Sequence, residues 1–126
     1  MAMIAMNRWT RSLLLAAWAV VLASPAAAHS ELEKTVPAAG SATRESPARL
    51  SLWFSQRFEP AFSRIRVLNA QGEQVDNGDA HVDRVDAHQF NVSLPKLAPG
   101  TYRVQWRVLS ADTHVSEGHF TFDVSP

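Results

Sequence analysis

The chain has 126 residues, with 12 lysines and arginines balanced by 12 aspartates and glutamates, so its formal net charge at pH 7 is zero. This length fits one small domain, and the sequence has no basic block of the kind expected of a nucleic-acid-binding protein. The chain contains no cysteine, so no disulfide can stabilise it.

Residues 1–28 have the layout of a secretory signal peptide. A basic, acid-free start is followed by the apolar run 13–23 and then by Ser24-Pro25-Ala26-Ala27-Ala28. The apolar run is about half of the ~20 residues that span a bilayer, which argues against a membrane anchor. We therefore expect export and cleavage after Ala28, with cleavage after Ala26 as the alternative. Cleavage after Ala28 leaves the domain 29–126.

Alternation of apolar and polar residues predicts five strands in this domain. Their apolar side chains recur at every second residue, which is the period of a strand with one buried face. The predicted strands are 49–55, 63–69, 88–94, 101–110 and 118–124. The residues expected to face the core are Leu50, Leu52, Phe54, Ile65, Val67, Phe90, Val92, Leu94, Tyr102, Val104, Trp106, Val108, Phe120, Phe122 and Val124.

Weaker strand patterns near 31–35 and 73–75 raise the expected number to about seven. Turn signals separate the strands at 70–73, at 76–79 and at Pro99-Gly100, where glycine suits the positive φ of a type II turn. No segment of the domain keeps a helical period. We predict an all-β fold, an immunoglobulin-like or Greek-key β-sandwich of about seven strands.

Asp112 and His114 are the first candidate metal ligands. They lie in the segment 110–114, between the last two predicted strands. Side chains two residues apart in an extended segment point to the same side, so a carboxylate and an imidazole can approach one point. By itself this spacing is more often a solvated turn than a metal site.

The mature amino terminus adds further candidate ligands. Cleavage after Ala28 makes His29 the first residue, and its α-amine and ring Nδ1 can then chelate one ion once both are deprotonated. With Asp112 and His114 the set has three nitrogens and one oxygen. Such a set favours Cu(II) in a tetragonal arrangement, while zinc remains an alternative.

Three segments, 29–41, 50–56 and 94–122, carry a family resemblance. The last contains P-G-T-Y, W-R-V, S-A-D-T-H and G-H-F in order. Across essentially the whole of 29–126 the chain resembles the CopC family of periplasmic copper-binding proteins. This resemblance implies a β-sandwich in the periplasm that serves copper homeostasis or resistance.

The resemblance also implies one Cu(II) per chain, bound by His29 and by Asp112 and His114 of the D-T-H loop. The implied partner is a copper-handling inner-membrane protein of the CopD type. Members of the family often have an acidic residue where this chain has Gln56, and Glu59 is the candidate substitute. The segment 71–88 contains no methionine, so we expect no thioether site for Cu(I).

The other histidines favour structural roles. His81 and His88 lie in an acidic segment that is more often a solvated loop than a metal site, and His119 alternates with Phe120 as a surface strand residue. Two functions compete for the copper site: a carrier that passes Cu(II) to another protein, and an oxidative enzyme with a histidine-brace-like centre. We expect the carrier, a monomer without enzymatic activity, because so small a domain offers little substrate surface.

Overall fold

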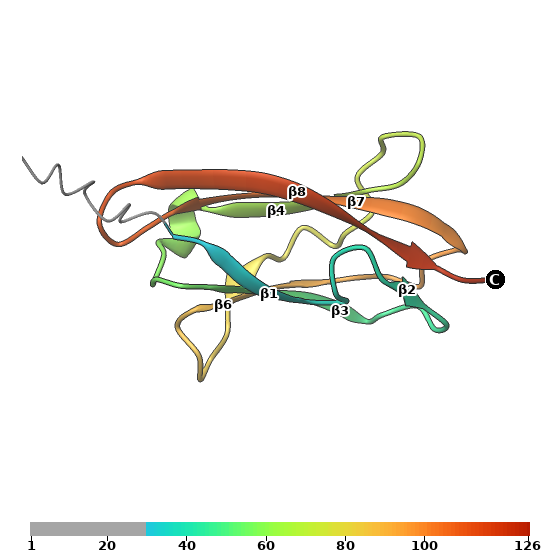
Figure 1. Ribbon diagram of the computed structural model, residues 1–126, viewed down its shortest axis with the longest axis horizontal. Helices are drawn as coiled ribbons and strands as arrows, with labels where there is room; N and C mark the ends of the chain where they lie inside the picture. Colours follow the sequence, from blue (N-terminus) through green and yellow to red (C-terminus); the bar gives the residue numbers. More distant parts are fainter. Residues whose placement is uncertain (1–29) are drawn as a thin grey trace, which may run out of the picture.

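Residues 30–126 form two four-stranded β-sheets that lie face to face in the computed structural model, which describes only these residues (Figure 1). The expected signal peptide and the candidate ligand His29 lie outside them. One sheet has the order β1 (Leu32–Val36), β3 (Arg49–Phe54), β6 (Gln89–Ser93) and β5 (His81–Val82). The other has the order β2 (Ala42–Thr43), β8 (Val115–Val124), β7 (Gly100–Leu109) and β4 (Arg64–Leu68). A 3-10 turn, η1 (Pro60–Phe62), precedes β4.

This arrangement confirms the predicted all-β sandwich. Strand β3 lies between β1 and β6, so neighbours in that sheet are not consecutive along the chain, as in Greek-key connections. Within residues 30–126 no helix is long and apolar enough to cross a membrane.

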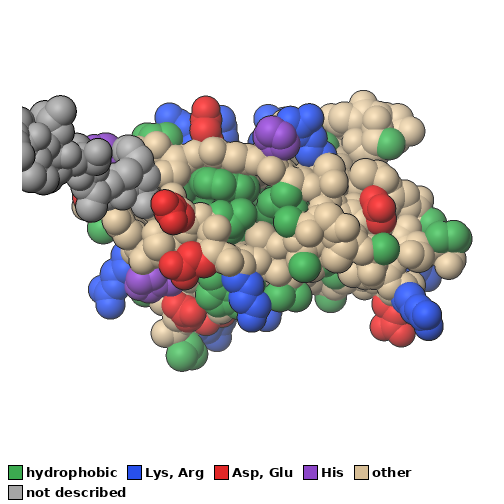
Figure 2. All heavy atoms as spheres, in the orientation of Figure 1, with side chains coloured by type: hydrophobic (Ala, Val, Ile, Leu, Met, Phe, Trp, Pro, Cys, Tyr) green, Lys and Arg blue, Asp and Glu red, His purple; other side chains and the backbone are tan. Residues whose placement is uncertain are grey.

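The core lies between the two sheets and is built from the residues that the alternation predicts. Leu50, Leu52, Val92 and Val104 have no solvent-exposed surface. Trp106 and Phe120 are only partly buried, although they pack against the core, and apolar side chains are visible between the sheets on the side of β1 and β8 (Figure 2). Burial of apolar surface from both sheets stabilises the domain without disulfides.

The five predicted strands are confirmed, with small changes at their ends. Strand β8 begins at Val115, three residues before the predicted start. The segment 73–75 forms an isolated bridge to Leu68 rather than a strand, and the two-residue strands β2 and β5 are additional. The sandwich therefore has eight strands instead of about seven, because two residues are too few to show a period.

The start of β7 differs from the predicted type II turn. Gly100 is the first residue of the strand and has φ 156°, far from the value of about +80° that such a turn needs. The nearby Tyr102 hydroxyl donates a hydrogen bond to the carbonyl of Ala98 at 2.6 Å. A tyrosine that bonds back to the preceding backbone is a feature of immunoglobulin-like sandwiches.

The segment 79–86, which contains β5, lies along the edge of β6. It buries Gln89 and Asn91, two polar residues that the alternation predicts to be outward, and Asn91 Nδ2 donates to Asp83 Oδ1 at 3.1 Å. The Ser93 hydroxyl and backbone N–H both donate to the Asp79 carboxylate. These two bonds, the hydroxyl first, lower the pKa of Asp79 from its usual value.

Candidate metal centre

A tight hairpin joins β7 to β8 and carries two of the candidate ligands. The Ser110 N–H donates to the His114 carbonyl at 2.8 Å, and the Thr113 N–H donates to the Ser110 carbonyl at 2.9 Å. These bonds enclose a three-residue loop, 111–113, whose last residue has the left-handed φ of 73°. A type I turn followed by one left-handed residue is a common three-residue hairpin, although glycine is the usual residue there.

The hairpin brings Asp112 and His114 together. The His114 backbone N–H donates to Asp112 Oδ1 at 3.2 Å, and His114 Nδ1 lies 3.3 Å from Asp112 Oδ2. The expectation that these two side chains approach one point is therefore confirmed for the pair. The reason differs from the predicted one, because the turn and not an extended segment places them side by side.

One oxygen of Asp112 suits a bound cation. Oδ2 is buried and has no hydrogen-bond partner among the described residues, although the side chain is 29% exposed. A buried acceptor without a hydrogen bond costs free energy that a cation can offset. Together with the adjacent imidazole it gives an oxygen and a nitrogen donor, a combination that both copper and zinc accept.

The hairpin is tied to the strand end at which the described chain begins. The Ala111 N–H donates to the Arg57 carbonyl at 2.9 Å, and Phe58 forms a β-bridge with Ser110. Ser55 precedes Arg57 by two residues, and its backbone N–H donates to the Glu31 carbonyl at 2.8 Å. The first described residues and the D-T-H hairpin therefore lie at the same end of the sandwich (Figure 1).

The same end holds three buried serine hydroxyls that the sequence analysis did not single out. Ser30, Ser110 and Ser116 each have a buried Oγ without a hydrogen-bond partner among residues 30–126. With Asp112 Oδ2, they are all the buried side-chain polar atoms of this kind in that range. The unsatisfied polar atoms of the described chain are thus gathered around one end, where a metal ion or its bound water could meet them.

The described residues supply only two ligands. They contain no group of three or more histidine, cysteine, aspartate or glutamate residues that could hold a metal ion. The structure therefore does not bring Glu59, the candidate substitute, into a cluster with Asp112 and His114. The Glu59 backbone N–H donates to the Leu109 carbonyl at 2.8 Å, so the residue lies at the same end of the fold as the hairpin without joining the two ligands.

The remaining histidines have other surroundings. His81 Nδ1 lies 2.7 Å from the Asp79 carbonyl, and His88 Nδ1 lies 3.0 Å from the Phe54 carbonyl. His119 is exposed on β8 opposite Gln105. His81 and His119 are exposed, as predicted for a polar loop and a surface strand, whereas His88 is half-buried against β3 and not part of a solvated loop.

Comparison with known proteins defines the class of this protein. The family model of the CopC domain matches residues 32–125, so the chain belongs to the CopC family. It is 36% identical to Protein YobA of Escherichia coli over 98 residues, which are 77% of this chain and 79% of that protein. It is 34% identical to copper resistance protein C of Escherichia coli over 110 residues, which are 82% and 86% of the two chains.

The copper transport protein CutJ of Bacillus subtilis is 32% identical over 119 residues, which are 94% of this chain but only 22% of CutJ. The chain thus spans about a fifth of that relative. The crystal structure of CopC from Methylosinus trichosporium OB3b has a TM-score of 0.73 and 37% identity, covering 78% of this chain and 95% of that one. The crystal structure of PcoC, a methionine-rich copper resistance protein from Escherichia coli, has a TM-score of 0.66 and 32% identity, covering 78% of this chain and 100% of that one.

Proposed function

We propose that this protein is a periplasmic copper carrier that binds one Cu(II) through His29, Asp112 and His114. The observation that carries the proposal is the buried Oδ2 of Asp112, which lies 3.3 Å from Nδ1 of the His114 imidazole. Copper resistance and transport proteins are among the relatives of the chain, which supports copper as the metal.

The third ligand would come from the mature amino terminus. Cleavage after Ala28 would free the α-amine of His29, which the chain joins directly to Ser30. Ser30 is buried, and the adjacent Glu31 donates its backbone N–H to Ser55 Oγ at 2.8 Å, at the end of the fold that also holds the D-T-H hairpin. A histidine attached there can supply an amine and an imidazole to the ion that Asp112 and His114 bind.

The proposed role is to bind Cu(II) for copper homeostasis or resistance and to release it to a CopD-type inner-membrane protein, without catalysis. One of the two ligands on this hairpin, His114, is exposed and therefore accessible to such an acceptor. The His114 side chain is 53% exposed. We propose that the carrier acts as a monomer.

Copper titration of two chains tests this proposal. One chain begins at His29 and the other retains Ala28 in front of it, and both are titrated with Cu(II) against a competing chelator. We expect one tight Cu(II) for the first chain and an affinity lower by at least about 10-fold for the second, because the amine chelate is lost. Equal affinities, or two equally tight ions per chain, would contradict the proposal. Matching circular dichroism spectra control for folding.

A further inference from the structure

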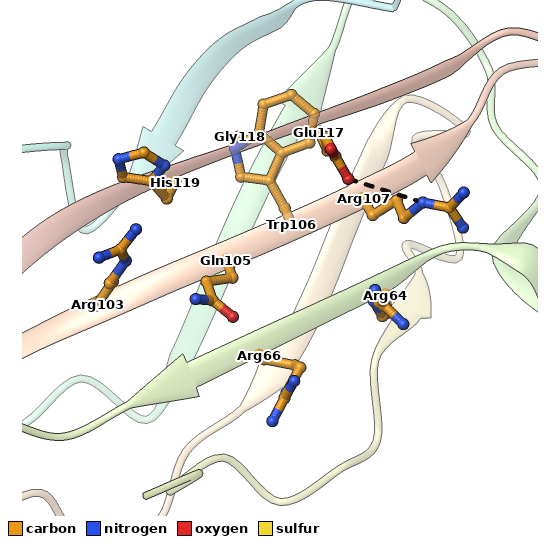
Figure 3. A pocket seen from close by; sticks show the side chains of 9 residues that line it. All are labelled: Arg64, Arg66, Arg103, Gln105, Trp106, Arg107, Glu117, Gly118 and His119. Carbon is orange, nitrogen blue, oxygen red and sulfur yellow. Dashed lines mark ion pairs between the residues drawn. The ribbon is translucent and has the colours of Figure 1, made fainter. Parts of the chain in front are cut away.

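The outer face of the β4–β7–β8 sheet carries a set of arginines that the metal centre does not use. Arg64 and Arg66 on β4 and Arg103 and Arg107 on β7 line one groove of about 380 Å³ (Figure 3). These four residues are called the arginine face here. All four are exposed, because they alternate with buried residues along their strands. Figure 2 shows basic side chains and a histidine along this edge of the molecule.

The strand register places like charges next to each other. Arg64 on β4 lies directly opposite Arg107 on β7, a cross-strand arrangement that destabilises a sheet. One row further, Arg66 lies opposite Gln105, which in turn lies opposite His119 of β8. An anion bound between these rows would remove the repulsion.

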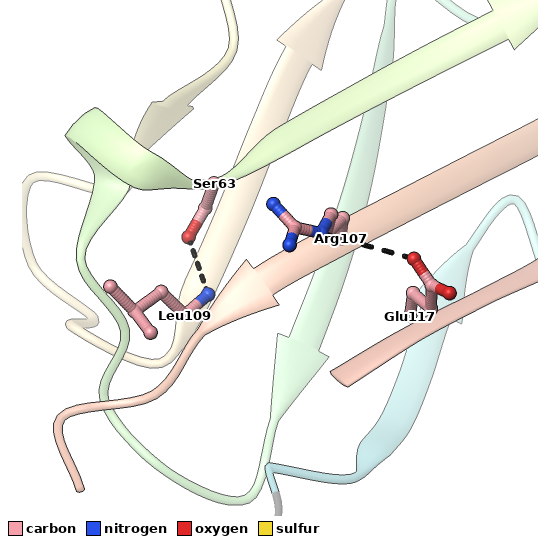
Figure 4. A network of polar contacts seen from close by, with 4 residues as sticks. All are labelled: Ser63, Arg107, Leu109 and Glu117. Carbon is pink, nitrogen blue, oxygen red and sulfur yellow. Dashed lines mark hydrogen bonds and ion pairs between the residues drawn. The ribbon is translucent and has the colours of Figure 1, made fainter. Parts of the chain in front are cut away.

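The described chain offers these arginines little neutralisation. Arg107 Nε lies 3.9 Å from Glu117 Oε2, an exposed pair of the kind that contributes little (Figure 4). No ion pair to Arg64, Arg66 or Arg103 is found among residues 30–126. Asp76 is bound to the same sheet, but its Oδ2 accepts a hydrogen bond from the Val67 backbone N–H of β4 at 2.8 Å, whereas Asp79 and Asp83 accept hydrogen bonds from β6 of the other sheet.

Apolar side chains connect the arginine face to the metal hairpin. The pair Leu109–Val115 lies two residues beyond the Arg107–Glu117 pair and is the last pair of the β7–β8 register before the hairpin. Val115 is 45% exposed and Phe62 of η1 is 69% exposed. The Leu109 N–H donates to Ser63 Oγ at 3.0 Å, which ties η1 to this part of β7 (Figure 4).

We propose that this face docks a partner protein through a carboxylate-rich segment, with the apolar end of the face next to the metal hairpin. Guanidinium groups bind carboxylates in two-point pairs, and protein interfaces combine arginine with exposed apolar residues in this way. A lipid surface is less suited, because the apolar side chains lie at one end of the face and not among the cations. The proposal rests on the proposed function in one respect, that the docked partner exchanges copper.

The test uses the protein purified after export, with its amino terminus determined, and an octaglutamate peptide as the probe. We expect the peptide to shift backbone amide resonances of residues 64–68, 103–107 and 117–119, and to bind more weakly as salt is added. The double variant Arg66→Glu/Arg103→Glu should weaken binding by at least about 10-fold. The control Arg44→Glu/Arg84→Glu has the same net charge but changes exposed residues outside the face, and it should bind like the parent.

Three outcomes would overturn the proposal: no binding at low salt, equal losses in both double variants, or resonance shifts confined to the other sheet. Binding of the parent to vesicles of phosphatidylcholine and phosphatidylglycerol, without binding to the peptide, would assign the face to lipid instead. Cu(II) titration of the same variants separates this proposal from the copper site. Both double variants should keep the parent affinity for copper, whether or not the peptide binds.

Discussion

The indole of Trp106 lies across Gly118 on the neighbouring strand. The two residues are partners in the β7–β8 register, and a Cβ at Gly118 would lie 2.6 Å from Trp106 Cζ2. The indole cannot move freely, because its ring packs edge to face on Phe54 at a centroid distance of 5.2 Å. Position 118 of β8 therefore requires a glycine, because the Trp106 indole fills the space that a side chain would need.

Gly118→Ala should lower the free energy of unfolding by about 1–3 kcal/mol, because the added methyl group overpacks a filled space. Urea unfolding followed by circular dichroism measures the change. The matched background is Trp106→Phe, whose smaller ring leaves room for the methyl group. If Gly118→Ala costs as much in that background as in the parent, the contact with the indole is not the cause.

Thr113→Asn should stabilise the domain. Thr113 has φ 73°, a left-handed conformation that is costly for a β-branched residue and that asparagine adopts more readily. We expect a gain of about 0.5–1 kcal/mol in the free energy of unfolding. The control is Thr101→Asn on β7, whose backbone lies in a strand, where asparagine should not stabilise. A loss of stability in Thr113→Asn would show that the threonine side chain has a role in this loop.

Asp79→Asn should make the stability of the domain less dependent on pH. The pKa of Asp79 is lowered in the folded protein by the Ser93 hydroxyl and backbone N–H, so its ionised form stabilises the fold at neutral pH. This contribution is complete above the usual aspartate pKa of about 3.9 and is lost as the pH falls through the lower folded value. The variant should therefore be less stable than the parent at neutral pH, and the difference should disappear in acid.

Thermal unfolding at a series of pH values measures this difference. Glu45→Gln is the control, because it removes the same charge from an exposed position. A difference between Asp79→Asn and the parent that stays constant down to the lowest pH would contradict the assignment.

His114→Ala and Asp112→Asn should each weaken Cu(II) binding strongly, because each removes a proposed ligand. Loss of a residue that only hydrogen-bonds a ligand costs about 10- to 100-fold in metal affinity, and we expect a larger loss here. Binding by the parent should also weaken as the pH falls, because protons compete with the metal for its nitrogen ligands. Competition titration with a chelator measures both effects. His81→Ala and His88→Ala are the controls, and a loss in either as large as that in His114→Ala would place copper elsewhere.

The strands could be predicted from the sequence because burial of one face imposes a period of two on the residues. Leu50, Leu52 and Phe54 show this period and are buried. The burial of Gln89 and Asn91 could not be predicted in this way, since it depends on how the preceding segment 79–86 folds back along the edge of β6. Tertiary contacts of this kind leave no local pattern.

The candidate site was predictable in part. The spacing of Asp112 and His114 indicated the pair, whereas the left-handed Thr113 that allows the turn was not expected of a threonine. The serines were missed for a different reason. A buried hydroxyl without a partner, such as that of Ser110, is apparent only when the surrounding chain is in place.

Electron paramagnetic resonance of the Cu(II)-loaded protein that begins at His29 tests the central claim most directly. The proposed ligands predict a tetragonal signal with hyperfine couplings to imidazole nitrogen, and the couplings from one imidazole should disappear in His114→Ala. A signal with oxygen ligands alone, or a spectrum that His114→Ala leaves unchanged, would contradict the proposed copper centre.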